Sequence, residues 1–153
     1  MSNLIDIYSK GDYPANILSN FSPNNFIMDG VECACMEGFL QSLKYRSIKK
    51  QIKICGLVGK EAKKAGKKKF FWRFSGNLYW QGKRYKRISK EFDELLLRAY
   101  KEMLKNEAFY NALKSSKNCL LKHSIGKHDK RKTILTEEEF INYLYLLRNE
   151  MIV

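Results

Sequence analysis

Apolar residues recur at helical spacing along most of the chain after residue 34, and only short segments show the alternation typical of strands. The clearest helix follows Ser89, whose hydroxyl can accept a hydrogen bond from the first turn, and it is predicted to end near Asn106. Its apolar face consists of Phe92, Leu95, Leu96, Ala99 and Met103. A helix with one such face has to bury it, so we expect helices packed around a common core.

The rest of the chain divides into further helices and short strands. Helices are predicted, from spacing and capping residues, over residues 35–47, 49–57, 60–66 and 107–114 and from Thr136 onward. Strands are predicted over residues 5–9, 26–28, 31–33, 78–80, 84–88 and 119–121. Because no linker-like stretch divides the 153 residues, we expect one domain over residues 1–153. The predicted fold class is α+β, helix-rich with a small antiparallel sheet.

The charge of the chain is strongly positive. It has 29 lysines and arginines against 16 acidic residues, a formal charge of +13. Such an excess attracts anionic partners, whether nucleic acid, phosphorylated small molecules or an acidic membrane surface, although solvated surface charge is the alternative explanation. The sequence has neither a signal-peptide pattern nor the ~20 apolar residues of a membrane span, so we expect a cytoplasmic protein that does not partner a membrane.

The cysteines do not form a recognisable framework. In a cytoplasmic protein we expect all four to be free thiols. A zinc site would need Cys33, Cys35, His123 and His128, but their spacing lacks the context of a zinc finger. We therefore expect no metal and no cofactor.

One polar face of the helix predicted over residues 35–47 carries three groups of different chemistry. Glu37, Gln41 and Lys44 fall at i, i+4 and i+7, which aligns a carboxylate, an amide and an ammonium over about 10 Å. A sugar phosphate fits this line, with the carboxylate at the reacting carbon, the amide on a hydroxyl and the ammonium on the phosphate. An ordinary amphipathic helix with a solvated face explains the same spacing.

Several motifs, in order, resemble the NADAR (YbiA-like) family. The strongest matches are Ile7-Tyr8-Ser9, Leu18-Ser19-Asn20-Phe21-Ser22-Pro23, Asp29-Gly30 and Glu37-x3-Gln41-x2-Lys44-Tyr45. Weaker matches follow at Ala62-x3-Gly66-Lys67, Leu120-Leu121-Lys122-His123-Ser124 and Leu144-x2-Leu147-Arg148. The resemblance spans nearly the whole chain and implies a small α+β domain with much helix.

The resemblance also implies an activity, the hydrolysis of an N-glycosidic bond to ribose. Known activities of the family remove ADP-ribose from modified guanine in nucleic acid, or act on phosphoribosylamino-pyrimidine intermediates of riboflavin synthesis. We expect the first, with ADP-ribosylated DNA or RNA as substrate. The second activity, and a non-catalytic module that binds ADP-ribose or nucleic acid, are the alternatives.

Catalytic roles follow from the same resemblance. Glu37 is expected to stabilise positive charge on the ribose and to deprotonate the attacking water. Asp129, in the loop that replaces the family's late motif, is the second carboxylate, since glycoside hydrolysis commonly uses a pair; a solvated loop aspartate is the alternative. His123 is expected to protonate or hydrogen-bond the leaving base, with a structural histidine as the alternative.

Substrate-binding roles fall on a loop and on two lysines. Ser19, Asn20 and Phe21 are expected to face the ribose and the base, because Asn can bond hydroxyls and Phe can stack. Without the resemblance, these residues indicate a plain turn. Lys44 and Lys67 are expected to bind phosphate.

Three features depart from the family pattern. Gly38 stands where the family usually has His, and residues 125–131 replace a loop that contains Trp-Gly. The segment with Trp72 and Trp80 resembles an insertion relative to short bacterial members. These departures concern the choice of substrate.

Basic residues cluster among aromatic ones. Lys83, Arg84, Lys86 and Arg87 surround Tyr85 and are expected to bind nucleic acid, since charges follow phosphates and rings stack on bases. A second basic face on the helix over residues 60–66 consists of Lys60, Lys63, Lys64, Lys67 and Lys68. Solvated charge is again the alternative.

Overall fold

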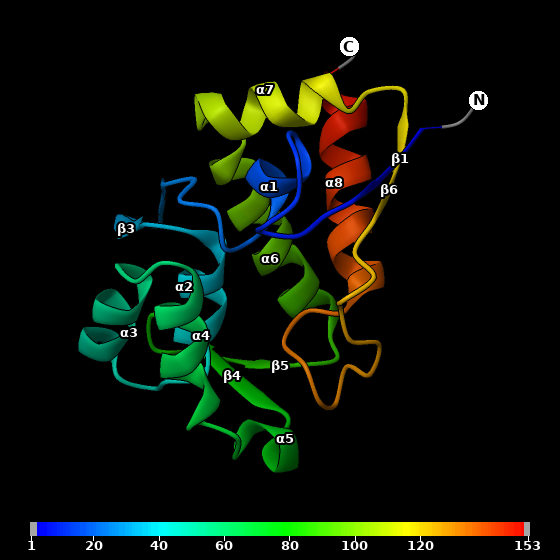
Figure 1. Ribbon diagram of the computed structural model, residues 1–153. Coiled ribbons are helices and arrows are strands. Elements are labelled where there is room, and N and C mark those ends of the chain that lie inside the picture. The colour runs from blue at the N-terminus through cyan, green and yellow to red at the C-terminus, as the bar shows by residue number, and fades with distance from the viewer. Residues whose placement is uncertain (1–2, 152–153) are drawn as a thin grey trace.

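The computed structural model describes residues 3–151 and is shown in Figure 1. Its helices are α1 (Ala15–Leu18), α2 (Met36–Ser42), α3 (Ile48–Cys55), α4 (Gly59–Lys67), α5 (Trp72–Ser75), α6 (Lys90–Met103), α7 (Glu107–Ser115) and α8 (Glu137–Met151). Its strands are β1 (Asn3–Asp6), β2 (Phe26–Met28), β3 (Val31–Cys33), β4 (Asn77–Trp80), β5 (Lys83–Lys86) and β6 (Cys119–Lys122). The prediction of a helix-rich α+β fold is confirmed. Within the described residues, no helix is long and apolar enough to cross a membrane.

The strands form three separate pairs in the described part of the chain. β2 and β3 are antiparallel around Asp29 and Gly30, and β4 and β5 around Gln81 and Gly82. All four turn residues have a positive φ, between 47° and 85°, which tight hairpin turns require. β1 and β6 are parallel, a pairing that the sequence did not predict, and they place the first strand beside a segment more than a hundred residues later in the chain (Figure 1).

β6 differs from the buried strand that the sequence predicts. Leu121 is 6% exposed, but its neighbour Leu120 is 54% exposed. The difference arises because β6 pairs with one strand and packs against α8 on one side, which leaves the other side to solvent.

α6 lies at the centre of the core and contacts α2, α8, β2 and β5. Phe92, Leu96, Ala99 and Tyr100 on this helix are fully buried. Ser89 caps the helix as predicted, since its Oγ accepts a hydrogen bond of 3.1 Å from the Phe92 N–H. Each large apolar side chain buried here stabilises the fold by roughly 1.5–3 kcal/mol.

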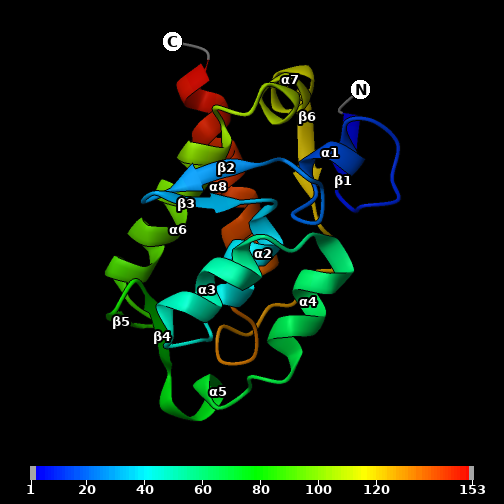
Figure 2. The same cartoon turned by 90° about the vertical axis from the view of Figure 1, so that its left-hand side faces the viewer.

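α2 packs between α6 and the pair α3 and α4, which Figure 2 shows side by side in front of it. α2 ends at Ser42, five residues earlier than predicted. The side chain of Gln51, 1% exposed, explains this end. Its Nε2, which has two hydrogens to share, lies within hydrogen-bond distance of the carbonyls of Ser42 at 3.2 Å, Tyr45 at 2.9 Å and Tyr79 at 2.8 Å. The Ser42 carbonyl at the end of α2 and the Tyr45 carbonyl just after it are therefore satisfied without a further helical turn.

Candidate active site

Glu37 lies in the first turn of α2, next to the loop that precedes β2. Its backbone N–H donates a hydrogen bond of 3.0 Å to the Asn20 carbonyl, and this bond ties the loop to the helix. The helix starts after Cys35, whose Sγ accepts from the Gly38 N–H at 3.4 Å. The backbone therefore fixes the position of Glu37 from both sides.

The Glu37 carboxylate is half-buried and hydrogen-bonded. Gln41, one turn later, donates a bond of 2.7 Å from its Nε2 to Glu37 Oε1. Burial raises the pKa of Glu37 above its ordinary value, while the Gln41 bond and the charges of Lys63, Lys44 and His123 oppose that rise. The net pKa stays raised, so this carboxylate has a greater affinity for a proton than an exposed one.

Lys44 stands two turns after Glu37 and is also largely buried. Its Nζ donates to the Gly66 carbonyl at 3.2 Å and lies 5.9 Å from the centroid of the Trp72 ring. Burial lowers the pKa of Lys44 to about 8; Glu37 opposes this shift, and the charges of Arg73 and Lys127 add to it. Because a bound anion stabilises the charged form of a lysine, an anion close to Lys44 would raise its pKa again.

Two glycines let the helices approach this site. A Cβ at Gly38 would lie 2.9 Å from the carbonyl oxygens of both Ile54 and Leu57, at the end of α3. This close approach of backbone gives a packing reason for a glycine at position 38. A Cβ at Gly66 in α4 would overlap the side chain of Gln41.

The predicted substrate loop is held from inside the molecule. Ser19 is 6% exposed and its Oγ accepts from the Phe21 N–H at 3.2 Å, so its side chain closes a local turn. The Asn20 Oδ1 accepts a hydrogen bond of 2.7 Å from the hydroxyl of Tyr100, a fully buried residue of α6. Phe21 is half-buried, and Lys63 Nζ lies 6.0 Å from its ring centroid. The structure thus brings Asn20 and Phe21 together with Glu37.

Tyr100 and Lys63 belong to this site, and the sequence analysis assigned neither to it. Tyr100 extends the apolar face of α6, where a phenol among apolar side chains signals a need for a polar partner. Lys63 stands out only in the structure, because four other lysines share its helical face.

His123 follows β6 and lies close enough to Glu37 for its charge to act on that carboxylate. Its Nδ1 lies 2.7 Å from the Ile7 carbonyl, which can only accept, so Nδ1 carries the hydrogen. Its backbone N–H donates to Glu137 Oε2 at 2.7 Å. With Nδ1 fixed in this way, Nε2 is the ring atom left to exchange a proton.

Within residues 3–151, no hydrogen bond or ion pair joins Glu37 to two of the predicted residues, Asp129 and Lys67. Asp129 is partly exposed and accepts hydrogen bonds from the Arg131 N–H at 2.9 Å and Nε at 3.4 Å. The Arg131 backbone bond holds the pKa of Asp129 below its ordinary value. Lys67 is exposed in the last turn of α4. Their roles stay predictions.

The prediction for Arg87 is corrected. This residue is 3% exposed, and its guanidinium binds Glu139 through Nη2 at 2.6 Å and Nη1 at 3.1 Å and the Thr133 carbonyl through Nε at 2.9 Å. The Arg87 guanidinium is paired with groups inside the fold, so it is not exposed to bind nucleic acid. The other members of the predicted basic cluster, Lys83, Arg84 and Lys86, are exposed on β5.

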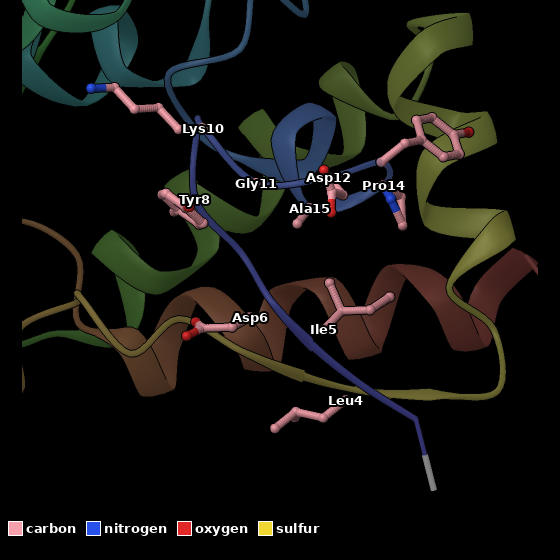
Figure 3. Close-up of a pocket in the computed structure, with 10 residues that line it drawn as sticks. Leu4, Ile5, Asp6, Tyr8, Lys10, Gly11, Asp12, Pro14 and Ala15 are labelled. Carbon is pink, nitrogen blue, oxygen red and sulfur yellow. The ribbon is translucent and has the colours of Figure 1, made fainter.

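Two hollows on the surface lie elsewhere. One, of about 360 Å³, is formed by β1 and the loop before α1, with Asp6, Tyr8 and Pro14 among its lining residues (Figure 3). The other, of about 260 Å³, lies beside β5 and α6 and is lined by Lys83, Tyr85, Glu91, Glu94, Leu95 and Arg98. Glu37 lines neither.

The fold defines a YbiA-like α+β domain. The structure is similar to the NMR structure of the E. coli protein YbiA, with a TM-score of 0.67 and 15% identity, over 99% of this chain and 87% of that one. At this identity the similarity concerns the fold alone, and it confirms the fold that the NADAR resemblance implies.

The chain belongs to the family described as Bacteriophage protein GP30.3, whose model matches residues 12–149. It is 40% identical over 149 residues to the "Uncharacterized 17.1 kDa protein in Gp30-rIII intergenic region" of Enterobacteria phage T4. That match covers 96% of this chain and 98% of the phage protein.

Proposed function

We propose that this protein is an N-glycosidase that hydrolyses the bond between a ribose and a base, and that it removes ADP-ribose from ADP-ribosylated guanine in nucleic acid. The observation that carries the proposal is the setting of Glu37: a half-buried carboxylate with a raised pKa, held by Gln41 at 2.7 Å and flanked by the cations of Lys44 and Lys63. The order of the motifs that resemble the NADAR family, and the YbiA-like fold, support it.

The proposed reaction needs a carboxylate at this place. When the ribosyl C–N bond breaks, positive charge builds on the sugar, and the ionised form of Glu37 stabilises it. The same carboxylate takes a proton from the attacking water, whose oxygen then bonds to the ribose carbon. Its raised pKa makes Glu37 a stronger base than an ordinary carboxylate.

The leaving base requires a proton as it departs. His123 suits this role better than Asp129 does, because Nδ1 keeps its hydrogen on the Ile7 carbonyl and the imidazolium form of the ring can give the proton on Nε2 to the base. The lowered pKa of Asp129 keeps its carboxyl group ionised at neutral pH, so it holds no proton to give to the leaving base.

The surroundings of Glu37 suit an anionic substrate. The charges of Lys44 and Lys63 act on Glu37, and those of Arg73 and Lys127 act on Lys44, so positive charge is concentrated on the Lys44 side of the carboxylate. The diphosphate of ADP-ribose supplies negative charge that these groups can bind, and its presence would raise the pKa of Lys44 and so keep this side chain charged.

Product release tests the proposal directly. Wild-type protein is incubated with an oligonucleotide that carries ADP-ribosylated guanine and, separately, with a phosphoribosylamino-pyrimidine, and released ADP-ribose or ribose phosphate is measured. We expect ADP-ribose from the oligonucleotide. Release from the pyrimidine alone would support N-glycosidase activity but make the phosphoribosylamino-pyrimidine the substrate. If neither substrate is cleaved but the protein still binds ADP-ribose, the protein is a binding module and not an enzyme.

A further inference from the structure

Three phenylalanines around α5 are unusually exposed. Phe70, Phe71 and Phe74 are 58%, 75% and 78% exposed, while Trp72 between them is 5% exposed. Trp72 therefore anchors the turn, and the three phenylalanine rings, here called the phenylalanine platform, point outward. Exposed apolar groups that lie together in this way mark a surface that binds something.

Two of these rings form one face. Phe71 caps the start of α5 and Phe74 lies in it three residues later, and their ring centroids are 6.4 Å apart with a tilt of 48°. Gly76 ends the helix with φ 71°, and its N–H donates to the Trp72 carbonyl at 2.7 Å. The C-terminal end of α5 is thus closed by a backbone hydrogen bond, so the platform is presented by a defined turn.

The charge around the platform has a single sign. Residues 62–90 contain eleven lysines and arginines and no acidic residue. Lys67, Lys68, Lys69 and Arg73, the basic residues nearest to the platform in sequence, are all exposed. Exposed rings next to these exposed basic residues complement a polyanion that carries flat apolar groups.

The platform is continuous with the site at Glu37. The Trp72 ring lies 5.9 Å from Lys44 Nζ, and the charge of Arg73 acts on Lys44. Lys69 Nζ lies 5.1 Å from the ring centroid of Tyr45, the residue after Lys44. A strand bound at α5 would therefore run beside the lysine that we assign to the phosphates of the substrate.

We propose that the phenylalanine platform holds single-stranded nucleic acid, with Phe71 and Phe74 stacking on bases next to the modified one and the lysines at positions 67–69 on phosphates. The strand has to be single because the bases of a duplex are stacked on one another and present no free face. The inference rests on the proposed function and names the form of nucleic acid that it acts upon.

Binding of unmodified oligonucleotides tests the inference apart from catalysis. The double variant Phe71→Ala/Phe74→Ala is compared with wild type and with Tyr110→Ala, which removes an exposed ring on α7, at the other end of the molecule from α5 (Figures 1 and 2). Wild type should bind a single strand more tightly than a duplex. The double variant should lose about tenfold or more for the single strand, while Tyr110→Ala should not differ from wild type.

The salt dependence separates stacking from charge. Changing Lys67, Lys68 and Lys69 to Gln should lower the slope of log affinity against log salt by about two for a single strand, while the Phe71→Ala/Phe74→Ala variant should keep the slope of wild type. Single-strand affinity that survives loss of both rings would overturn the inference. So would binding to acidic phospholipid vesicles that is lost with the rings, because the platform would then face a membrane.

A substrate comparison keeps this inference distinct from the proposed function. The double variant should cleave an ADP-ribosylated guanosine mononucleotide as fast as wild type and a modified oligonucleotide more slowly. If the double variant matches wild type on both substrates, the platform has no part in substrate binding and the glycosidase activity stands. If wild type cleaves neither substrate but binds single strands in a way that depends on the two rings, the platform would stand as a binding surface and the glycosidase activity would be contradicted.

Discussion

Gly66 of α4 lies directly against Gln41 of α2, so closely that a methyl group at position 66 would overlap Gln41 Oε1. That oxygen is buried and accepts no hydrogen bond within residues 3–151, while the Nε2 of the same amide donates to Glu37. The absence of a side chain at position 66 therefore sets the position of Gln41, and through it that of the carboxylate.

The Gly66→Ala variant should for this reason lose activity. In an ordinary helix the change stabilises by about 1 kcal/mol, but here it displaces Gln41 and breaks its bond to Glu37. We expect kcat to fall about tenfold or more and the free energy of unfolding to fall by about 1–3 kcal/mol. Gly56→Ala is the control, because its Cβ would approach nothing closer than 3.4 Å. Full activity in Gly66→Ala would contradict this role of Gln41.

Glu37 should make the stability of the protein depend on pH. Burial raises its pKa in the folded state, so the folded protein binds the proton more tightly than the unfolded chain does. As the pH rises above the ordinary value of 4.5, the unfolded chain ionises first and stability is lost until the folded carboxyl ionises too. Each tenfold difference in proton affinity corresponds to about 1.4 kcal/mol.

Glu37→Gln removes this loss. In denaturant titrations the variant should be more stable than wild type at pH 8, and the difference should shrink towards pH 4.5. A variant that is equally or less stable than wild type at pH 8 would show that the folded protein does not disfavour the ionised carboxylate.

Lys44 should make the affinity for ADP-ribose depend on pH. Its pKa of about 8 means that the free protein loses this charge at mildly alkaline pH. We expect the dissociation constant to rise by up to tenfold per pH unit above about pH 8. In Lys44→Arg the rise should be absent, and in Lys60→Arg, a change on an exposed position of α4, it should persist. Calorimetric titration with ADP-ribose between pH 7 and 9.5 measures the dissociation constant of each variant. The same dependence on pH in wild type and Lys44→Arg would rule out a contact between Lys44 and the phosphates of ADP-ribose.

Arg87 should be needed for folding and not for binding nucleic acid. It forms a buried pair with Glu139, and removal of one partner of such a pair costs about 3–5 kcal/mol. Arg87→Gln should lower the free energy of unfolding by that amount. Arg84→Gln, at an exposed position of β5, should change it by no more than about 0.5 kcal/mol. Comparable stability of the two variants would contradict the role of the buried pair.

The sequence predicted local structure well where one segment carries all the information. The Asp29-Gly30 hairpin and the helix capped by Ser89 follow from turn and capping chemistry within a few residues. The parallel pairing of β1 with β6 could not be predicted in this way, because its register depends on strands more than a hundred residues apart.

The candidate site shows the same division. The proximity of Glu37 and Gln41 was predictable from the geometry of one helix, and the Gln41 bond to Glu37 agrees with it. Lys44, predicted on the same helix, lies beyond the end of α2 at Ser42. The partnership of Tyr100 with Asn20 and the burial of Arg87 against Glu139 are tertiary contacts. A count of charges along the chain cannot distinguish a buried arginine from an exposed one.

The central claim is that the Glu37 carboxylate performs the hydrolysis. The most direct test is the single-turnover rate of ADP-ribose release from an ADP-ribosylated-guanine oligonucleotide by wild type, by Glu37→Gln and by Glu32→Gln, which changes an exposed glutamate on β3. We predict that Glu37→Gln is slower by about 100-fold or more and binds ADP-ribose as wild type does, while Glu32→Gln is unchanged. A Glu37→Gln variant that releases ADP-ribose at the wild-type rate would contradict the claim.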